Sequence, residues 1–288
     1  MRILLTGRSG QIGSALEHAL APLGEVIAVD RAGLDLRDAD AIKRKIGGLK
    51  PAIIVNAAAY TAVDRAEQEE RLAFEVNFQG AKELAREAKS IDALLIHFST
   101  DYVFDGEKET AYVESDGPHP LNVYGRTKLE GERLALRANP EILVIRTSWL
   151  LSGTHPNFAS KMVELISKGP VRVVDDQRGC PTLVDDLVVA TNSAIKTRTA
   201  GVLHLVNNGQ TTWFGLAREI AEIAGLDPDA VSPCPSSEYP RPAKRPLNSV
   251  LESERLDELM ISRLPHYRQS LETAIRQIWE GPHGITSL

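Results

Sequence analysis

The sequence predicts an α/β fold, in which a doubly wound parallel sheet is joined to a smaller domain of mixed α+β structure. Short apolar runs alternate with helical segments from residue 2 to about residue 150, as in a parallel sheet covered on both faces. Beyond that point the alternation is less regular. We therefore predict two domains, residues 1–150 and 151–288, with the second returning some of its elements to the first.

The first strand runs into a turn that contains three glycines. Arg2–Thr6 is a short apolar run of the kind that a parallel sheet buries. Gly7 then permits a tight turn, Gly10 lets the backbone approach a pyrophosphate, and Gly13 lets the following helix pack on the strand. The N–H groups at the start of that helix favour an anion. This pattern predicts a Rossmann-type dinucleotide site; an incidental glycine-rich loop is the alternative.

A second strand, Glu25–Val29, ends in Asp30, about 20 residues past the turn, where an acid accepts from the adenosine ribose. The loop from residue 31 to residue 36 can fold against an adenine ring. Asp30 favours NADH, whereas Arg8 and Arg31 can clamp the additional phosphate of NADPH. The sequence therefore predicts that the chain uses either NADPH or NADH.

A third strand, residues 52–56, opens into a run of alanines. Small residues at the carboxyl end of a strand leave room for a cofactor, and open α/β sheets bind ligands at that edge. A small-residue helix start is an equally good interpretation. The predicted cofactor-binding residues are Gly7, Gly10, Gln11, Ile12, Gly13, Asp30, Asp35, Leu36, Ala57, Ala58, Ala59, Tyr60, Thr61, Tyr124 and Lys128.

Residues 64–89 carry an apolar stripe that is consistent with one long helix or two abutting helices. Asn77 interrupts this stripe on the face that we expect to be buried. A buried Asn needs partners, so Asn77 can tie together the backbone of neighbouring strands. A solvent-facing Asn is the alternative.

The predicted chemistry lies between the fourth strand, residues 94–98, and the helix that follows. Hydride transfer to a ketone leaves an alkoxide that must be protonated. Tyr124 and Lys128 are four residues apart and share one helix face, so the ammonium is expected to lower the pKa of the phenol. Thr100, at the strand end, can hold the carbonyl oxygen. Tyr followed by Lys at this spacing is common by chance, so the pair alone indicates little.

The second half supplies less regular elements. A fifth strand, residues 142–146, leads to Trp149. This tryptophan is either a core residue or part of a binding site at the strand end. Arg241, Lys244 and Arg245 form a cationic cluster that suits a substrate pyrophosphate, although a solvated loop is an alternative. We expect helices at residues 158–168, 183–196 and 213–224, and strands at residues 171–174 and 202–206. Residues 228–246 hold too many prolines for regular structure, and we expect a loose tail beyond residue 280.

Several segments together resemble the extended short-chain dehydrogenase/reductases that act on nucleotide sugars. These segments are Gly7-x-x-Gly10-x-x-Gly13, Asn56–Ala59, Ser99–Phe104 and Tyr124-x-x-x-Lys128. Others are similar to the dTDP-4-dehydrorhamnose reductase family in particular: Asn122–Gly125, Arg146–Trp149, Asp176-Gln177, Pro181-Thr182 and Tyr239–Pro246.

The resemblance implies reduction of the C4 keto group of dTDP-4-dehydro-β-L-rhamnose, with Tyr124 as proton donor and Lys128 as its partner. It implies a substrate site made of Thr100, Asp101, Trp149, Arg241 and Arg245. Related dehydratases carry an Asp-Glu pair where this chain has Asp101-Tyr102, which favours reduction without elimination. A reductase of another dTDP-4-keto-6-deoxy sugar and a non-catalytic NADP-binding regulatory subunit are the alternatives.

Composition narrows the class of protein. A net charge of -6 argues against nucleic-acid and membrane-surface binding, and no apolar run is long enough to cross a bilayer, so we expect a cytoplasmic protein. Neither the two cysteines nor the seven histidines show metal-ligand spacing, which predicts no catalytic metal. Some relatives hold Mg²⁺ at a homodimer interface with a Glu in the first helix. Ser14-Ala15-Leu16 in this chain argues against that metal and that dimer.

Overall fold

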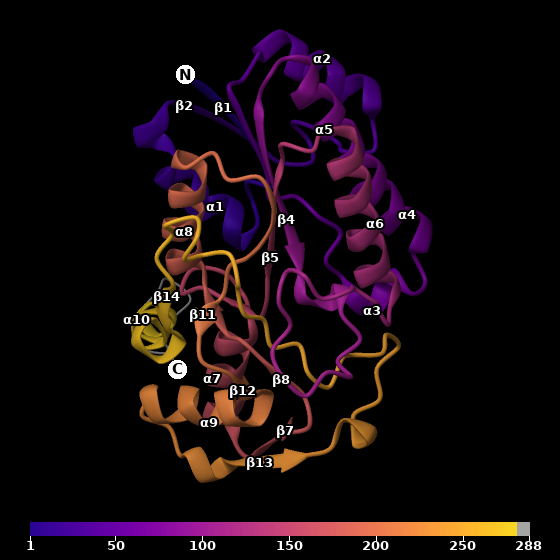
Figure 1. Cartoon of the computed structure of the whole chain (residues 1–288). Helices are drawn as coiled ribbons and strands as arrows, with labels where there is room; N and C mark the ends of the chain where they lie inside the picture. Colours follow the sequence, from indigo (N-terminus) through magenta and orange to yellow (C-terminus); the bar gives the residue numbers. More distant parts are fainter. Residues whose placement is uncertain (281–288) are drawn as a thin grey trace.

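The computed structural model describes residues 1–280, so the tail predicted beyond residue 280 lies outside the described part. Its centre is a six-stranded sheet in the order β10-β5-β4-β3-β1-β2, in which every pair of neighbours is parallel (Figure 1). The strands are β1 (Arg2–Thr6), β2 (Glu25–Val29), β3 (Ile53–Asn56), β4 (Leu94–Thr100), β5 (Leu143–Thr147) and β10 (Gly201–His204). The predicted doubly wound parallel sheet is confirmed.

Side chains alternate between the two faces of this sheet, and helices cover both faces. Ile3 and Leu5 pack with the helices α1 and α8, whereas Leu4 packs with α2, α5 and α6 on the opposite side (Figure 1). None of the described helices is long and apolar enough to cross a membrane. These covering helices are α1 (Gln11–Ala19), α2 (Ala39–Leu49), α5 (Gly80–Ser90), α6 (Val123–Ala138) and α8 (Val184–Lys196).

The strand order reverses between β1 and β3, because β2 lies on one side of β1 and β3 on the other. Open α/β sheets bind ligands in the crevice at such a point. Gly7 lies there with φ of +79°, and a Cβ on it would come within 2.6 Å of the Ala57 carbonyl carbon. The backbones that follow β1 and β3 therefore approach as closely as they do because residue 7 is glycine.

The segment after β3 forms α3 (Val63–Ala66) and then α4 (Glu70–Phe74), which continues through a π-helical turn (Glu75–Gln79) into α5. Asn77 in this turn is buried, as one of the two interpretations predicted. Its side chain accepts from the Tyr60 N–H (2.8 Å) and donates to the Tyr60 carbonyl (3.1 Å) and to the Thr127 hydroxyl (3.1 Å). It thus ties the loop after β3 to α6 and not to a neighbouring strand.

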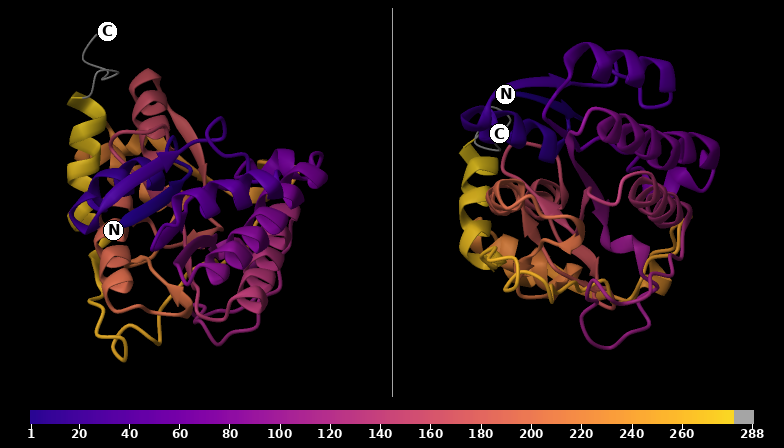
Figure 2. Two further views of the ribbon diagram at one scale, coloured as in Figure 1. Left: turned by 90° about the horizontal axis from the view of Figure 1, so that it is seen from above. Right: turned by 45° about the horizontal axis from the view of Figure 1, so that its top comes forward.

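A second core lies beside the carboxyl ends of the central strands, where α7, α9 and the β7–β13 pair gather (Figures 1 and 2). Its elements are α7 (Phe158–Lys168), β7 (Val171–Val174), α9 (Trp213–Ile223), β13 (Val231–Cys234) and α10 (Tyr267–Glu280). Since β10 completes the central sheet, residues after 150 serve both cores. The domain boundary itself stays a prediction.

Strand β13 corrects the expectation that the proline-rich segment lacks regular structure. It pairs in parallel with β7 and includes Pro233. An edge strand tolerates proline, because one side of its backbone has no ladder to complete. The remaining short strands form three two-stranded pairs outside the central sheet: β6 (Leu150–Leu151) with β9 (Thr182–Leu183), β8 (Arg178–Gly179) with β12 (Thr211–Thr212), and β11 (Asn207–Asn208) with β14 (Leu264–His266).

Candidate active site

A cleft of about 560 Å³ lies at the carboxyl ends of β1, β2 and β3. Helix α1 begins at this cleft. Its N-cap, Gly10, is extended, and no side chain accepts from the N–H groups of the first turn, so these groups can bind an anion. The predicted cofactor residues that line this cleft are Gly7, Gly10, Asp30, Asp35, Leu36, Ala57, Ala58, Ala59, Tyr60 and Thr61. The glycine turn, the small residues and the acid at the end of β2 fit a dinucleotide.

Some residues differ from their predicted place in this cleft. The predicted residues that do not line it are Gln11, Ile12, Gly13, Tyr124 and Lys128. A Cβ on Gly13 would meet the Gly7 carbonyl oxygen at 2.0 Å, so this glycine lets α1 pack on the turn. The sequence also missed lining residues on α3, α4 and the adjoining turns, which an apolar stripe does not reveal. They are Ala62, Arg65, Glu69, Leu72 and Val76.

Charged side chains surround the adenosine end of the cleft. Arg37 holds the pKa of Asp35 at about 2 through its hydrogen bonds, and Arg31 lies 3.6 Å from the same carboxylate. Arg8, which could also clamp a phosphate, is bonded to Glu17 at 2.8 Å. Both arginines that favour NADPH thus lie beside carboxylates on the protein surface.

Three predicted residues meet at the end of β4. The Thr100 hydroxyl donates to Asp101 Oδ1 (2.9 Å) and accepts from the Tyr102 N–H (3.2 Å), and the Tyr124 phenol lies near enough for this hydroxyl to lower the phenol's pKa. Tyr124 lies in the first turn of α6, whose N-cap Asn122 accepts from Gly125 N–H at 2.8 Å. The structure therefore brings Thr100, Asp101 and Tyr124 into one cluster.

Lys128 does not act on Tyr124 as predicted. Its ammonium donates to the Phe98 carbonyl oxygen (2.6 Å), lies 3.4 Å from His97 Nε2, and makes no hydrogen bond to Tyr124 among the described contacts. Burial raises the pKa of Tyr124, and the Thr100 hydroxyl only partly offsets this effect. The predicted lowering of that pKa is wrong, because desolvation of the phenolate outweighs other effects.

Burial also lowers the pKa of Lys128 to about 8, although the negative charge of Glu132 favours the ammonium.

Buried polar side chains beside Lys128 are joined by hydrogen bonds. Asn56 Oδ1 accepts from Thr6 (2.6 Å) and from the Ala58 N–H (3.2 Å), so its amide nitrogen faces His97 Nδ1 at 2.8 Å. Burial keeps the pKa of His97 well below its usual value, so this ring is neutral. Sequence reasoning missed His97, although a polar residue within an apolar strand was a signal.

A second cleft, of about 570 Å³, borders Tyr102. Trp213 lines it and stacks on Trp149 with ring centroids 3.5 Å apart and planes 5° apart. Trp149 has φ of +43°, and a Cβ on Gly179 would come within 2.3 Å of its indole. Other lining residues are Phe158, Lys161, Arg172, Gln177, Tyr239, Arg241 and Arg245. The sequence had identified only the last two of these, because the pocket is assembled from distant segments.

The proline-rich loop reaches across to the first half of the chain (Figure 2). Arg245 bonds both carboxylate oxygens of Asp64, Arg241 lies 3.6 Å from the same group, and Asn122 donates to the Lys244 carbonyl at 2.8 Å. Hydrogen bonding by Arg245 lowers the pKa of Asp64. The loop is therefore held in place, and two of its three cations face the second cleft.

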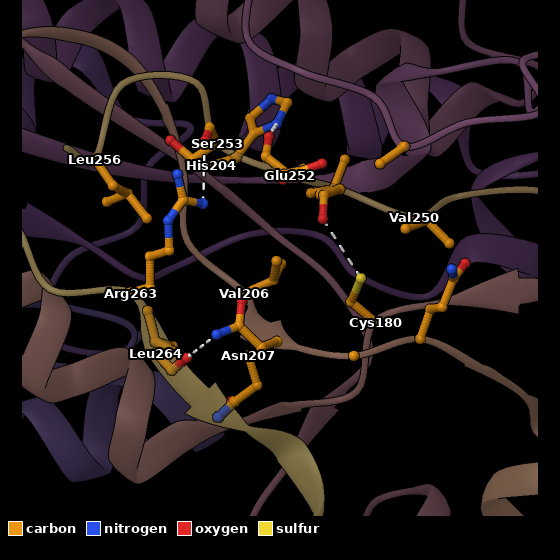
Figure 3. A pocket seen from close by; sticks show the side chains of 15 residues that line it. Cys180, His204, Val206, Asn207, Val250, Glu252, Ser253, Leu256, Arg263 and Leu264 are labelled. Carbon is orange, nitrogen blue, oxygen red and sulfur yellow. Dashed lines mark hydrogen bonds between the residues drawn. The ribbon is translucent and has the colours of Figure 1, made fainter. Parts of the chain in front are cut away.

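A smaller cavity of about 210 Å³ lies away from both clefts. Figure 3 shows that its polar groups are bonded to one another: His204 Nδ1 to the Glu252 carbonyl, Arg263 to the Ser253 carbonyl and Cys180 Sγ to the Leu251 carbonyl. Residues 1–280 also contain no group of three or more His, Cys, Asp or Glu side chains that could hold a metal ion.

Comparison with known proteins identifies the family. The model of the RmlD substrate-binding domain matches residues 1–279. The chain belongs to this family. A curated relative from Burkholderia thailandensis, named dTDP-4-dehydrorhamnose reductase, is 38% identical over 96% of this chain and 99% of its own length.

Solved structures of the RmlD family agree with this membership. A dTDP-4-dehydrorhamnose reductase from Clostridium acetobutylicum superposes with a TM-score of 0.93 at 37% identity, covering 96% of this chain and 99% of that one. A second, from Bacillus anthracis in complex with NADP, has a TM-score of 0.92 at 33% identity, with the same two coverages of 96% and 99%.

Proposed function

We propose that this chain uses NADPH or NADH to reduce the C4 keto group of dTDP-4-dehydro-β-L-rhamnose, giving dTDP-L-rhamnose. The observation that carries the proposal is the position of Tyr124. Its ring packs edge-on against Tyr102, which lines the second cleft (centroids 5.8 Å apart), and shares a cluster with Tyr60, which lines the first. A proton donor placed between a dinucleotide cleft and a cationic, aromatic cleft suits reduction of a nucleotide sugar.

The residues have separate tasks in this reaction. The glycine turn, Asp30 and the Ala57–Thr61 loop hold the cofactor, which supplies a hydride when bound. The Thr100 hydroxyl orients the carbonyl oxygen, and Tyr124 donates its proton to the alkoxide as it forms. The raised pKa of Tyr124 keeps the phenol protonated before that step.

The second cleft provides for the nucleotide. Arg241 and Arg245 suit the diphosphate, because a guanidinium binds phosphate oxygens in pairs. The Trp149–Trp213 stack and Phe158 offer flat apolar surface for the sugar and the base. Trp149 contacts the sugar nucleotide in this proposal, and Asp101 lies beside it.

The test supplies dTDP-4-dehydro-β-L-rhamnose and follows the absorbance of NADPH, with Tyr124→Phe as the comparison. We expect rapid oxidation by the wild type and a slow rate in the variant. Product stereochemistry by NMR distinguishes rhamnose from another deoxysugar. Tight NADP binding without turnover on a panel of dTDP sugars would instead indicate a regulatory subunit.

Location, assembly and cofactor choice belong to the same proposal. The acidic composition and the reducing compartment that two unpaired cysteines suggest support a cytoplasmic enzyme. We propose a homodimer that does not depend on Mg²⁺, because Ser14-Ala15-Leu16 lacks the Glu of the metal-linked dimer, and light scattering with and without Mg²⁺ tests it. Comparing kcat/KM for NADPH and NADH decides between the cofactors, and we expect both to be used.

A further inference from the structure

The Thr100 hydroxyl has no hydrogen left to donate to a substrate. A hydroxyl has one hydrogen to donate and two lone pairs that accept. Thr100 gives its hydrogen to Asp101 Oδ1 at 2.9 Å and accepts from the Tyr102 N–H at 3.2 Å. One of its two lone pairs is therefore left to accept a further hydrogen bond.

Asp101 is the group that holds the Thr100 hydrogen. Its side chain is 3% exposed, and Oδ2 has no hydrogen-bond partner among the described residues. Burial raises the pKa of Asp101 to about 6, although the Ser249 and Thr100 hydroxyls favour the carboxylate. The titratable groups that face Asp101 are Tyr102, Tyr124 and Cys180. No cation is among them. Cys180 also lines the smaller cavity (Figure 3).

A carbonyl oxygen can accept from Thr100 only if the Thr100 hydrogen leaves Asp101. The carboxylate would then lose its donor at Oδ1 while Oδ2 has no partner among the described residues, and a buried carboxylate that loses a donor is destabilised. A neutral acid removes this conflict, because its O–H can donate to the free lone pair of Thr100. Thr100 can then donate its own hydrogen to the substrate.

We propose that Asp101 takes up one proton from solvent when the keto sugar binds, and that the resulting acid donates to Thr100 and turns the Thr100 hydrogen toward the carbonyl oxygen. Asp101 acts through Thr100, so it is a positioning residue. The proton returns to solvent when the product leaves. This inference rests on the proposed function and adds a protonation step to it.

Calorimetry of a non-reacting complex tests the proposal. Enzyme saturated with NADP⁺ is titrated with dTDP-4-dehydro-β-L-rhamnose in buffers of different ionisation enthalpy; both reactants are oxidised, so no hydride moves. We expect uptake of close to one proton at pH 8, falling toward zero at pH 5, where Asp101 is already protonated. The apparent Kd should rise about ten-fold per pH unit above about pH 6.

Two variants separate this role from a structural one. Asp101→Asn keeps the shape and can always donate, so proton uptake and the pH dependence of Kd should both disappear. Asp92→Asn, an exposed residue before β4, should bind like the wild type. Binding without uptake at pH 8, or equal uptake in Asp101→Asn, would overturn the inference, since a sugar hydroxyl would then satisfy the carboxylate. If Asp101→Asn does not fold, the wild-type titration alone decides. Failure of the sugar to bind at all would instead count against the proposed function.

Discussion

Replacing Lys128 with Met should remove the free-energy cost of burying a charged lysine in the folded protein. The Lys128 side chain is 1% exposed, and burial lowers its pKa from 10.5 to about 8. This lowering corresponds to about 3 kcal/mol against the folded state at pH 7. Leaving the Phe98 carbonyl without the ammonium costs about 1–3 kcal/mol, so Lys128→Met should be as stable as the wild type or slightly more stable.

The pH dependence gives the sharper result. Below pH 8 the lysine is charged in both the folded and the unfolded chain, so the whole penalty is present. Between about pH 8 and pH 10.5 the folded chain loses the proton first, so wild-type stability should rise relative to Lys128→Met by about 3 kcal/mol. Urea unfolding of both proteins from pH 7 to pH 10 measures this difference, with the exposed Lys89→Met as control. A difference that stays constant with pH would refute the reasoning.

Three further predictions concern the site. Tyr124→Phe should lower kcat by roughly 10²–10⁴-fold with little change in KM, measured by NADPH oxidation. In Gly7→Ala the new Cβ would lie 2.6 Å from the backbone of Ala57, and residue 7 has a φ of +79° that alanine rarely adopts. The affinity for NADPH, measured by its fluorescence, should therefore fall at least about ten-fold. An unchanged affinity would argue against this turn as the cofactor site. Arg245→Gln should raise KM for the dTDP sugar about ten-fold with kcat nearly unchanged, since a positive charge that attracts the diphosphate is removed from the second cleft; equal KM values would remove Arg245 from the site.

The central sheet could be predicted from sequence because its signals are local. Each strand is a short apolar run, and the glycine turn, Asp30 and the alanine loop follow directly from strand ends. The strand predicted at residues 202–206 is β10 (Gly201–His204), which joins the central sheet. Strand β13 could not be, because its pairing with β7 and its edge position override the intrinsic preference of proline.

The second cleft was harder to predict, because distant segments build it. Trp213 becomes part of a site only when it meets Trp149 from another element. The electrostatics were missed for the same reason. Spacing placed Tyr124 and Lys128 on one helix face, but it did not show that Lys128 turns to the Phe98 carbonyl or that burial controls both pKa values.

The proposed reaction transfers a hydride from the cofactor to C4 of the sugar, and isotope labelling tests this transfer directly. With dTDP-4-dehydro-β-L-rhamnose and NADPH deuterated at the transferred position, the wild type should give dTDP-L-rhamnose carrying deuterium at C4, and Tyr124→Phe should give almost none in the same time. Deuterium at another carbon, or an equal yield from both proteins, would contradict a C4 reduction that depends on the Tyr124 phenol.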